Sequence, residues 1–485
     1  MSHGDHLTAG LLAVLPAAVL LVTGLATVLL DRGRPAAPGL LRAVAASGLV
    51  LALLAQLAGL LPLQPSRAAF LAAQGDATID RFGILAGAMV LVLGLGGVLA
   101  VPWALGRLRP HLGTYCAALL GLSAGADIVC NSGSLPGLYG GAELAGISGV
   151  LMIAVDKRAA GSNRGALRLL ISGGVGSGVA LYGMALLVGL SGHLRLTDLA
   201  ATLPGGALAA TAVTLVLAGL LFKLAVAPLL LDTDDPRGGV ATGTLAPLVA
   251  VSIVAGYAGV ARLVAVLPAG TRVPVEGILA VLAAGALLGG GLRALQAGTV
   301  AGLARALAGS GVGLLLVALV GTRATSGGIT AGLLQAAALG GGLLAMGALG
   351  APVEGAGHSH RLRGLGHRHP RGALTVACGV VILAGVPPLL GALARAAVME
   401  SALLSGFGWL AVVTAVAWLL SLIACARALS AVYAGGAEVD AQLRDRRPQA
   451  GGRWALGFAG VLLAAPLFLQ QLTGIAGRAA SAVLR

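Results

Sequence analysis

Long, unbroken apolar runs constrain this sequence more than any other feature. A helix that crosses a bilayer needs about 20 mostly apolar residues. Charged residues make up only 10% of the chain, against about 25% in soluble globular proteins, so a water-soluble surface is excluded. The sequence therefore predicts an all-α, polytopic membrane protein with about fourteen transmembrane helices. The fourteen runs lie near residues 7–30, 39–63, 82–106, 113–131, 134–155, 165–192, 205–231, 240–262, 273–293, 297–320, 327–350, 372–396, 402–433 and 453–475.

Other protein classes fit this sequence poorly. The runs do not alternate between apolar and polar residues, as the strands of a membrane β-barrel would. The net charge of +14 comes mainly from arginines in short loops between runs, so it does not indicate nucleic-acid binding. The four cysteines lie inside apolar runs, without the spacing of metal ligands or disulfides. The sequence has no Walker loop, dinucleotide fingerprint, or haem or iron–sulfur ligand set, and we expect no metal, cofactor or redox site in this chain.

The distribution of basic residues predicts the orientation of the chain. Loops that follow odd-numbered runs carry most of the lysines and arginines, whereas loops that follow even-numbered runs carry few. Cytoplasmic loops of membrane proteins are enriched in these residues. We therefore expect both termini on the outer face of the membrane.

Two ionisable residues fall in the middle of apolar runs. Glu143 lies in the motif YGGAELAGIS, and Lys223 lies in LLFKLAVAPLLL. A charge at this depth is costly and marks a candidate functional site. Lys223 is one of only two lysines among 31 basic residues, and lysine, unlike arginine, can lose its proton when buried. The pattern favours a site that alternates between charged and neutral forms, with a purely structural Glu–Lys pair as the alternative.

Prolines interrupt two of the runs. Pro228 lies in the seventh run, and Pro387 and Pro388 lie in the twelfth. Proline removes a backbone donor and breaks or kinks a helix, and discontinuous helices at mid-membrane recur in ion-translocating repeats. Arg395 and Glu400 follow the proline pair and are further candidate charges, within the membrane or at the helix end.

Three features are weaker candidates. Asp127 in the fourth run and Arg305 in the tenth run are possible secondary sites, or packing contacts to a neighbouring helix or subunit. Four histidines in segment 358–369 resemble a metal-binding tract, but the arginines among them argue against a cation site. A solvated loop on lipid head groups is the better interpretation of that segment.

The order and spacing of the motifs resemble the antiporter-like membrane subunits of respiratory complex I, most closely the subunit N family of NADH-quinone oxidoreductases. The similarity covers nearly the whole chain. It is carried by LLAVLPAAVLLVTGLATVLLD, DRFGILAGAMVLVL, AELAGIS, RGALRLLISGGVGSGVALYGMALLVGLSGHLRLTDLA, FKLAVAPLLLDTD and LAGVPPLLGALAR.

The resemblance implies a fold and a function. The family has fourteen helices with two inverted five-helix repeats, helices 4–8 and 9–13, in which helices 7 and 12 are broken. The corresponding divisions here are 1–112, 113–262, 263–433 and 434–485. The implied activity is proton translocation coupled to redox chemistry in other subunits. Glu143 and Lys223 would form the charged pair of the first half-channel, and Arg395 stands where subunit N usually has lysine.

The resemblance also implies partners and a location. The chain would be a non-redox subunit of a proton-translocating NADH:quinone oxidoreductase in a bacterial inner membrane. Its partners would be other membrane and peripheral subunits of a multi-subunit complex. Quinone, NADH, FMN and iron–sulfur clusters are expected in those partners and not in this chain.

The sequence departs from the family pattern in the second half. The family's helix-8 lysine aligns with Ile253, the basic pair that opens helix 10 aligns with Ala301 and Gly302, and a helix-10 histidine aligns with Gly311. These departures leave a gap between helices 8 and 12 in the series of protonatable groups. Arg395 cannot carry protons across it, because guanidinium does not deprotonate in proteins.

Three alternatives therefore stay open. The chain could be a membrane subunit of a group 4 hydrogenase or of a multi-subunit cation/proton antiporter. It could also be a degenerate, non-conducting scaffold, which the loss of the helix-8 lysine would suit. An unrelated secondary transporter is the third, although aromatic residues make up only 3% of the chain and no aromatic substrate site is evident.

Overall fold

The computed structural model describes most of the first nine-tenths of the chain. The described residues are 3–33, 38–59, 71–72, 77–78, 80–100, 111–155, 160–226, 229, 240, 242–321, 326–353, 363–368 and 370–434. This part is helical except for short connections and two antiparallel two-residue strands, β1 (Leu71–Ala72) and β2 (Ala77–Thr78). The prediction of an all-α membrane protein is confirmed.

Twelve helices in the described residues are long and apolar enough to cross a membrane. They match the first eleven predicted runs and the thirteenth, and the chain is therefore a multi-pass membrane protein. The helices that contain these spans are α1 (His3–Gly33), α2 (Pro38–Ala58), α3 (Arg81–Ala100), α5 (Leu112–Cys130), α6 (Leu135–Ala154), α7 (Ala160–Ser191), α9 (Ala207–Leu221) together with the π-helical segment η5 (Phe222–Val226), α11 (Thr242–Ala265), α12 (Ala269–Gln296), α13 (Val300–Val317), α14 (Ser326–Val353) and α18 (Gly408–Tyr433).

The remaining helical elements are short. They are α8 (Leu196–Thr202), α15 (Leu365–Arg368), α16 (Pro370–Ala384) and α17 (Leu390–Leu404). The fourteenth predicted run, 453–475, lies outside the described residues, so the predicted total of fourteen helices stays a prediction.

The twelfth predicted run is two helices, α16 and α17. Five residues between them include Pro387 and Pro388, and Gly385 adopts a left-handed backbone conformation with φ of 66°. Two prolines remove two backbone donors, and a positive φ ends a right-handed helix. The indole nitrogen Nε1 of Trp418 donates to the Gly385 carbonyl at 2.9 Å, which satisfies one carbonyl that the break leaves without an intrahelical partner. The predicted break in this helix is confirmed.

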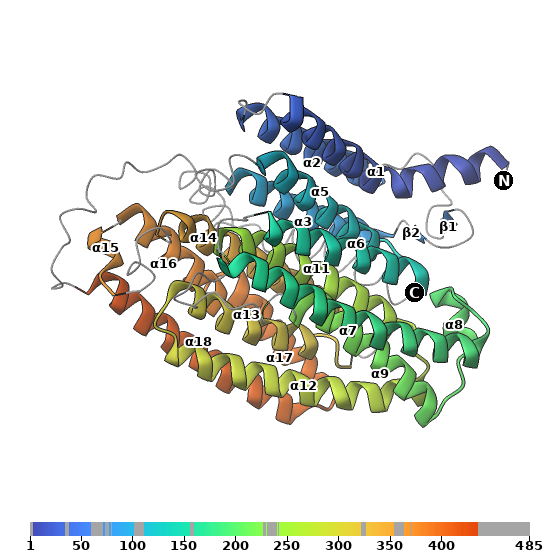
Figure 1. Ribbon diagram of the computed structural model, residues 1–485. Coiled ribbons are helices and arrows are strands. Elements are labelled where there is room, and N and C mark those ends of the chain that lie inside the picture. The colour runs from blue at the N-terminus through green and yellow to red at the C-terminus, as the bar shows by residue number, and fades with distance from the viewer. Residues whose placement is uncertain are drawn as a thin grey trace.

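The helices form one bundle in which they run side by side (Figure 1). Helices α1 and α2 lie at one edge, and α12 and α18 lie at the opposite edge. The centre consists of α11 and α14: all residues of the most apolar stretch of α11 are buried, and 94% of those in α14 are buried. Polar side chains within these two stretches, such as Ser252 on α11 and Gln335 on α14, are therefore surrounded by protein.

Small residues allow this dense packing. Gly125 on α5 lies against the backbone of Gly141 and Ala145 on α6, and a Cβ atom added at Gly125 would collide with that backbone. Close approach of backbones through small residues is the usual mode of helix association in lipid. The glycine and alanine content of the sequence thus serves the interfaces of the bundle.

Candidate functional site

Lys223 lies where α-helical winding stops. Helix α9 ends at Leu221, and the chain continues as the π-helical segment η5, in which Lys223 is the second residue. Pro228 lies outside the described residues, so its predicted role in this break stays a prediction. Short π-helical segments inside α-helices are frequent at functional sites, and they displace side chains from the α-helical register. Here the displaced side chain is the one lysine that the sequence places in a spanning segment.

Glu143 and Lys223, predicted to lie close together, form an ion pair. Lys223 Nζ lies 2.6 Å from Glu143 Oε2, and it donates a second hydrogen bond to Ser177 Oγ at 2.6 Å. The three residues come from η5, α6 and α7 respectively. Two partners for one ammonium group in a buried site are the arrangement that offsets the cost of burying its charge.

The pair is asymmetric in its exposure. The side chain of Lys223 is 7% exposed, whereas that of Glu143 is 28% exposed. Gly146 makes room for the lysine, because a Cβ atom there would lie 2.7 Å from Lys223 Cε. The lysine is therefore enclosed by helices, and the carboxylate reaches toward the side of the bundle. Protons can be exchanged at such a pair if the lysine alternates between its charged and neutral forms.

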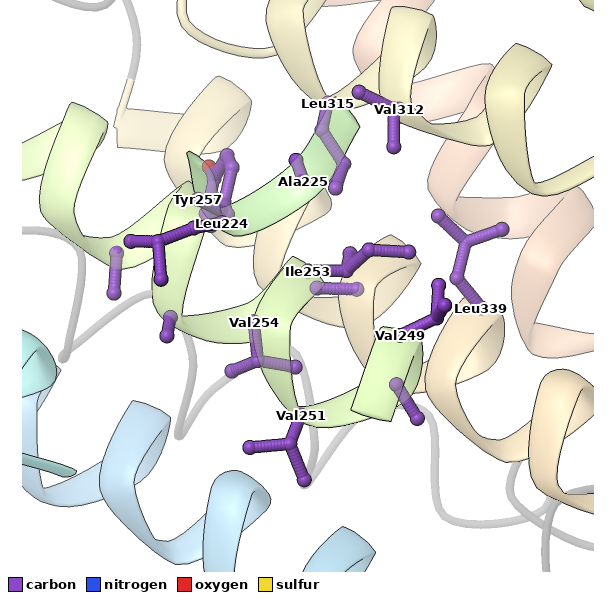
Figure 2. Packing of buried hydrophobic residues seen from close by; sticks show 14 of the residues in the cluster. Leu224, Ala225, Val249, Val251, Ile253, Val254, Tyr257, Val312, Leu315 and Leu339 are labelled. Atoms are coloured by element: carbon purple, nitrogen blue, oxygen red, sulfur yellow. The ribbon is translucent and has the colours of Figure 1, made fainter. Parts of the chain in front are cut away.

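Apolar side chains from η5, α11, α13 and α14 pack together around Ile253 and form an apolar layer next to Lys223 in the chain (Figure 2). Ile253 on α11 is 1% exposed and lies in a cluster with side chains from η5, α13 and α14 (Figure 2). Tyr257, one turn further along α11, donates its hydroxyl hydrogen to the Ile329 carbonyl at 3.0 Å. The labelled members of this cluster are Leu224, Ala225, Val249, Val251, Ile253, Val254, Tyr257, Val312, Leu315 and Leu339.

Arg395 occupies the break between α16 and α17. It is 3% exposed, and Nη2 donates to the Leu383 carbonyl at 2.8 Å. Its Nη1 atom is buried and has no hydrogen-bond partner among the described residues. Glu400, the other candidate on α17, is exposed and forms no ion pair with Arg395. Arg395 is thus a fixed positive charge that caps a broken helix end, with hydrogen-bonding capacity left for water.

Asp127 belongs to a buried polar cluster that is separate from the Glu143–Lys223 pair. Its Oδ1 atom accepts a hydrogen bond from Asn131 Nδ2 at 3.1 Å. Gln56 Nε2 lies 3.4 Å from Asn131 Oδ1 and donates to the Gly83 carbonyl at 3.1 Å. Gly87 on α3 leaves space for both side chains, since a Cβ atom there would collide with Gln56 and Asp127. The cluster joins α2, α3 and α5.

Arg262 at the end of α11 extends this cluster. Its Nη2 atom lies 2.5 Å from Asp80 Oδ1, its Nε atom donates to the Cys130 carbonyl at 2.7 Å, and its guanidinium lies over the Phe82 ring. No sequence motif marks Asp80, Arg262, Gln56 or Asn131 as members of a site. Polar residues at the ends of apolar runs look like loop flanks, and no pattern in one sequence distinguishes a buried cluster there.

Replacing Arg262 with methionine will destabilise the protein. The substitution leaves the Asp80 carboxylate without its cation, and removing one partner of a buried ion pair costs about 3–5 kcal/mol. We expect a lower midpoint of thermal unfolding for the purified variant in detergent. The double variant Arg262→Met with Asp80→Asn removes both charges and should recover part of the loss. An unchanged midpoint in the single variant would mean that the pair does not hold α3 and α11 together.

Arg305 lines a small cavity between the first turns of α11 and α13 and the later part of α14. The space open to the centre of a water molecule is about 20 Å³, which is enough for about one water. The lining residues are Leu229, Leu245, Ala246, Val249, Ala301, Ala304, Arg305 and Leu343. Arg305 is thus the polar group of an otherwise apolar cavity.

The predicted histidine cluster lies mostly outside the described residues. His358, His360 and His369 are not described, and His367 is exposed at α15. Among the described residues, no three His, Cys, Asp or Glu side chains are grouped as metal ligands.

Comparison with known proteins assigns the chain to a family. Residues 132–421 match the family described as NADH:quinone oxidoreductase/Mrp antiporter, TM. A relative from Streptomyces griseus subsp. griseus, NADH-quinone oxidoreductase subunit N 2, is 32% identical over 433 residues, 85% of this chain and 80% of the relative. NADH-quinone oxidoreductase subunit N of Laribacter hongkongensis is 28% identical over 359 residues, 71% of this chain and 72% of that protein.

Solved structures share the fold. A chain of the archaeal membrane-bound sulfane sulfur reductase has a TM-score of 0.77 at 19% identity, and 97% of this chain and 98% of that one are covered. A chain of respiratory complex I from Thermus thermophilus has a TM-score of 0.72 at 22% identity, with 95% and 98% covered. A chain of the Mrp complex from a Dietzia species gives 0.74 at 19% identity, with 97% and 100% covered. By sequence and by fold, this chain belongs to the NADH:quinone oxidoreductase/Mrp antiporter transmembrane family.

Proposed function

We propose that this chain is the proton-translocating membrane subunit, of the subunit N type, in a complex I-type NADH:quinone oxidoreductase. The observation that carries the proposal is the buried ion pair between Lys223 and Glu143 at the π-helical break. A costly charged pair in a spanning region indicates an ion pathway. The relatives named NADH-quinone oxidoreductase subunit N support the assignment of the complex.

The geometry of the pair suggests how a proton would be held and released. While Lys223 and Glu143 are paired, the lysine keeps its proton on Nζ, because the Glu143 carboxylate and the Ser177 hydroxyl both accept hydrogen bonds from it. A change of charge near Glu143 would weaken the pair and favour the neutral amine, since a buried ammonium without a partner is strongly disfavoured. The proton would then leave Nζ for water. When the ion pair forms again, the Glu143 carboxylate would favour the charged lysine, and Nζ would take up a new proton.

The redox reaction would take place in partner subunits. NADH, FMN, iron–sulfur clusters and quinone would bind there, and this chain would contribute buried charges alone. We further propose the two five-helix repeats 113–262 and 263–433, flanked by 1–112 and 434–485, and Arg395 as the fixed charge of the second repeat. The location that fits the bacterial relatives is the inner membrane, with both termini on the outer face.

Co-purification in mild detergent tests the identity of the complex. Subunits that carry flavin, iron–sulfur clusters and an NADH site should accompany this chain. Nickel–iron hydrogenase subunits would instead favour a group 4 hydrogenase, and small antiporter subunits would favour an Mrp-type antiporter. The family description, which names both enzyme and antiporter, motivates this second candidate function. Isolation of the chain in a complex that transports no ions would favour the scaffold alternative, which Ile253 motivates.

Cysteine labelling tests the predicted orientation of the chain in the membrane. His367 is exposed in the basic loop predicted to be cytoplasmic, and His193 is exposed in a loop predicted to face outward. We expect the variant His367→Cys to react with an impermeant maleimide in inside-out vesicles, and His193→Cys to react in right-side-out vesicles. Three of the four native cysteines are buried, which keeps the background low. The opposite labelling pattern would reverse the assigned topology.

A further inference from the structure

Gln335 is a buried polar side chain with no assigned role. It lies on α14, one of the two central helices, and is 1% exposed. Its amide oxygen Oε1 is buried and has no hydrogen-bond donor among the described residues. Leaving such a group unpaired costs about 1–3 kcal/mol, and buried polar groups without a protein partner commonly bind an internal water.

The helical register places Gln335 against α11 and α13. Gly332 and Leu339 lie three residues before it and four residues after it, on the same face of α14. At Gly332, the ring and hydroxyl of Tyr257 from α11 fill the space that a side chain would take. At Leu339, the side chain fills the space above Gly311 on α13. Gln335 therefore lies between these two contacts, in the interface that contains the apolar layer around Ile253.

Helices α11 and α14 run in opposite directions along this interface. Tyr257 on α11 contacts Gly332 on α14, whereas Val249 and Leu343 line the Arg305 cavity together. Ile253, midway between Val249 and Tyr257, is thus at the level of Leu339, with both in the cluster of Figure 2. Gln335 lies on one side of this layer, and the cavity lies on the other. The eight residues from Gln335 to Leu343 correspond to about 12 Å along the helix axis.

Two other buried polar atoms also lack a partner among the described residues along the proposed pathway. They are Glu143 Oε1 on α6 and Arg395 Nη1 on α17. Gln335 Oε1, on the central helix α14, is the third such atom. In the sequence, Gln335 lies between Glu143 and Arg395. The three atoms lie on α6 in the first proposed repeat and on α14 and α17 in the second, and each has hydrogen-bonding capacity that a water can fill.

We propose that Gln335 binds an internal water and serves as the polar step of the second repeat, at the layer where Ile253 replaces the lysine of the family. This inference rests on the proposed function. The neutral amide cannot carry a net charge, so it orders water through which protons move and does not store a proton itself. Leu339, whose side chain fills the space above Gly311 on α13, lies along α14 between this water and the Arg305 cavity.

A high-resolution map of the assembled complex tests the water site directly. We expect density for a water within about 2.7–3.2 Å of Gln335 Oε1. A protein donor bonded to Oε1, or a dry site around it, would overturn the proposal. This result does not depend on whether the chain pumps protons, so it separates the binding site from the proposed function.

Proton pumping by the reconstituted complex tests the role of that water. Complexes with Gln335→Leu should have a proton-to-electron ratio as low as that of complexes with Lys223→Ala. Adding Ile253→Lys to Gln335→Leu should restore the ratio. Gln56→Leu is the matched control, because Gln56 is also buried but lies in the separate cluster of α2, α3 and α5. It should leave the ratio unchanged.

The proton-to-electron ratios of these variants distinguish an error in the proposed function from an error in the role of Gln335. An unchanged ratio in assembled Lys223→Ala complexes would refute the proposed function. An impaired Lys223→Ala complex with an unaffected Gln335→Leu complex would refute only the role of Gln335. A Gln335→Leu defect that Ile253→Lys does not relieve would assign Gln335 to packing of α14 and would likewise overturn the proposal.

Discussion

Complexes that carry Lys223→Arg will assemble but will lose the proton pumping that depends on this chain. Arginine keeps the positive charge that Glu143 needs, so the ion pair between η5 and α6 persists. A guanidinium does not deprotonate in proteins, so the site can no longer alternate between charged and neutral forms. The measurement is the proton-to-electron ratio of the purified complex in liposomes, with the rate of NADH oxidation determined in parallel.

Two further variants separate a proton-carrying role from a structural one. Lys223→Ala leaves Glu143 without its cation and should lower both pumping and stability. Ser177→Ala removes one acceptor of Lys223 Nζ but leaves the ion pair, so it should weaken pumping less. If Lys223→Arg pumps as well as the wild type, the pair only holds helices together, and proton transfer at this site is disproved.

The sequence was informative about this pair because of where its charges lie. A carboxylate and an ammonium in mid-membrane each need a partner, and no other lysine is in a spanning run. Pairing therefore followed from energetics alone. The π-helical winding of η5 did not follow, because no residue type specifies that hydrogen-bond pattern. Pro228 indicated a break nearby, and the structure shows that the α-helical pattern already ends at Leu221, two residues before Lys223.

The fold was predictable for a similar reason. Apolar runs of spanning length correspond to the twelve spanning helices and to the divided helix α16–α17. Even the two closely spaced helix pairs, α5–α6 and α12–α13, were separable from the sequence. In contrast, Gln335 was not recognised, since one neutral polar residue in an apolar run has no distinctive pattern. The same holds for Arg262 and Asp80, whose pairing depends on helices that are far apart in the sequence.

Replacing Ile253 with lysine is expected to raise the proton-to-electron ratio. The substitution restores a protonatable group to the apolar layer between η5 and α14, where isoleucine can neither bind a proton nor order water. Wild-type pumping is expected to be reduced relative to relatives with lysine here, yet not abolished, because Glu143 and Lys223 persist. The new side chain would lie in the interface that also contains the Gln335 amide oxygen, which can accept a hydrogen bond from its ammonium group.

The cost of the new charge must be separated from its effect on the pathway. A charged lysine at the centre of a spanning helix costs about 2.5–3.5 kcal/mol on insertion scales, so assembly is measured for each variant. Val254→Lys is the matched control: Val254 is equally buried on α11 but points to a different face of the helix, and it should destabilise the complex without raising the ratio. Ile253→Met tests side-chain size without charge. If assembled Ile253→Lys complexes pump no more than the wild type, the apolar layer around Ile253 does not limit proton transfer by this chain.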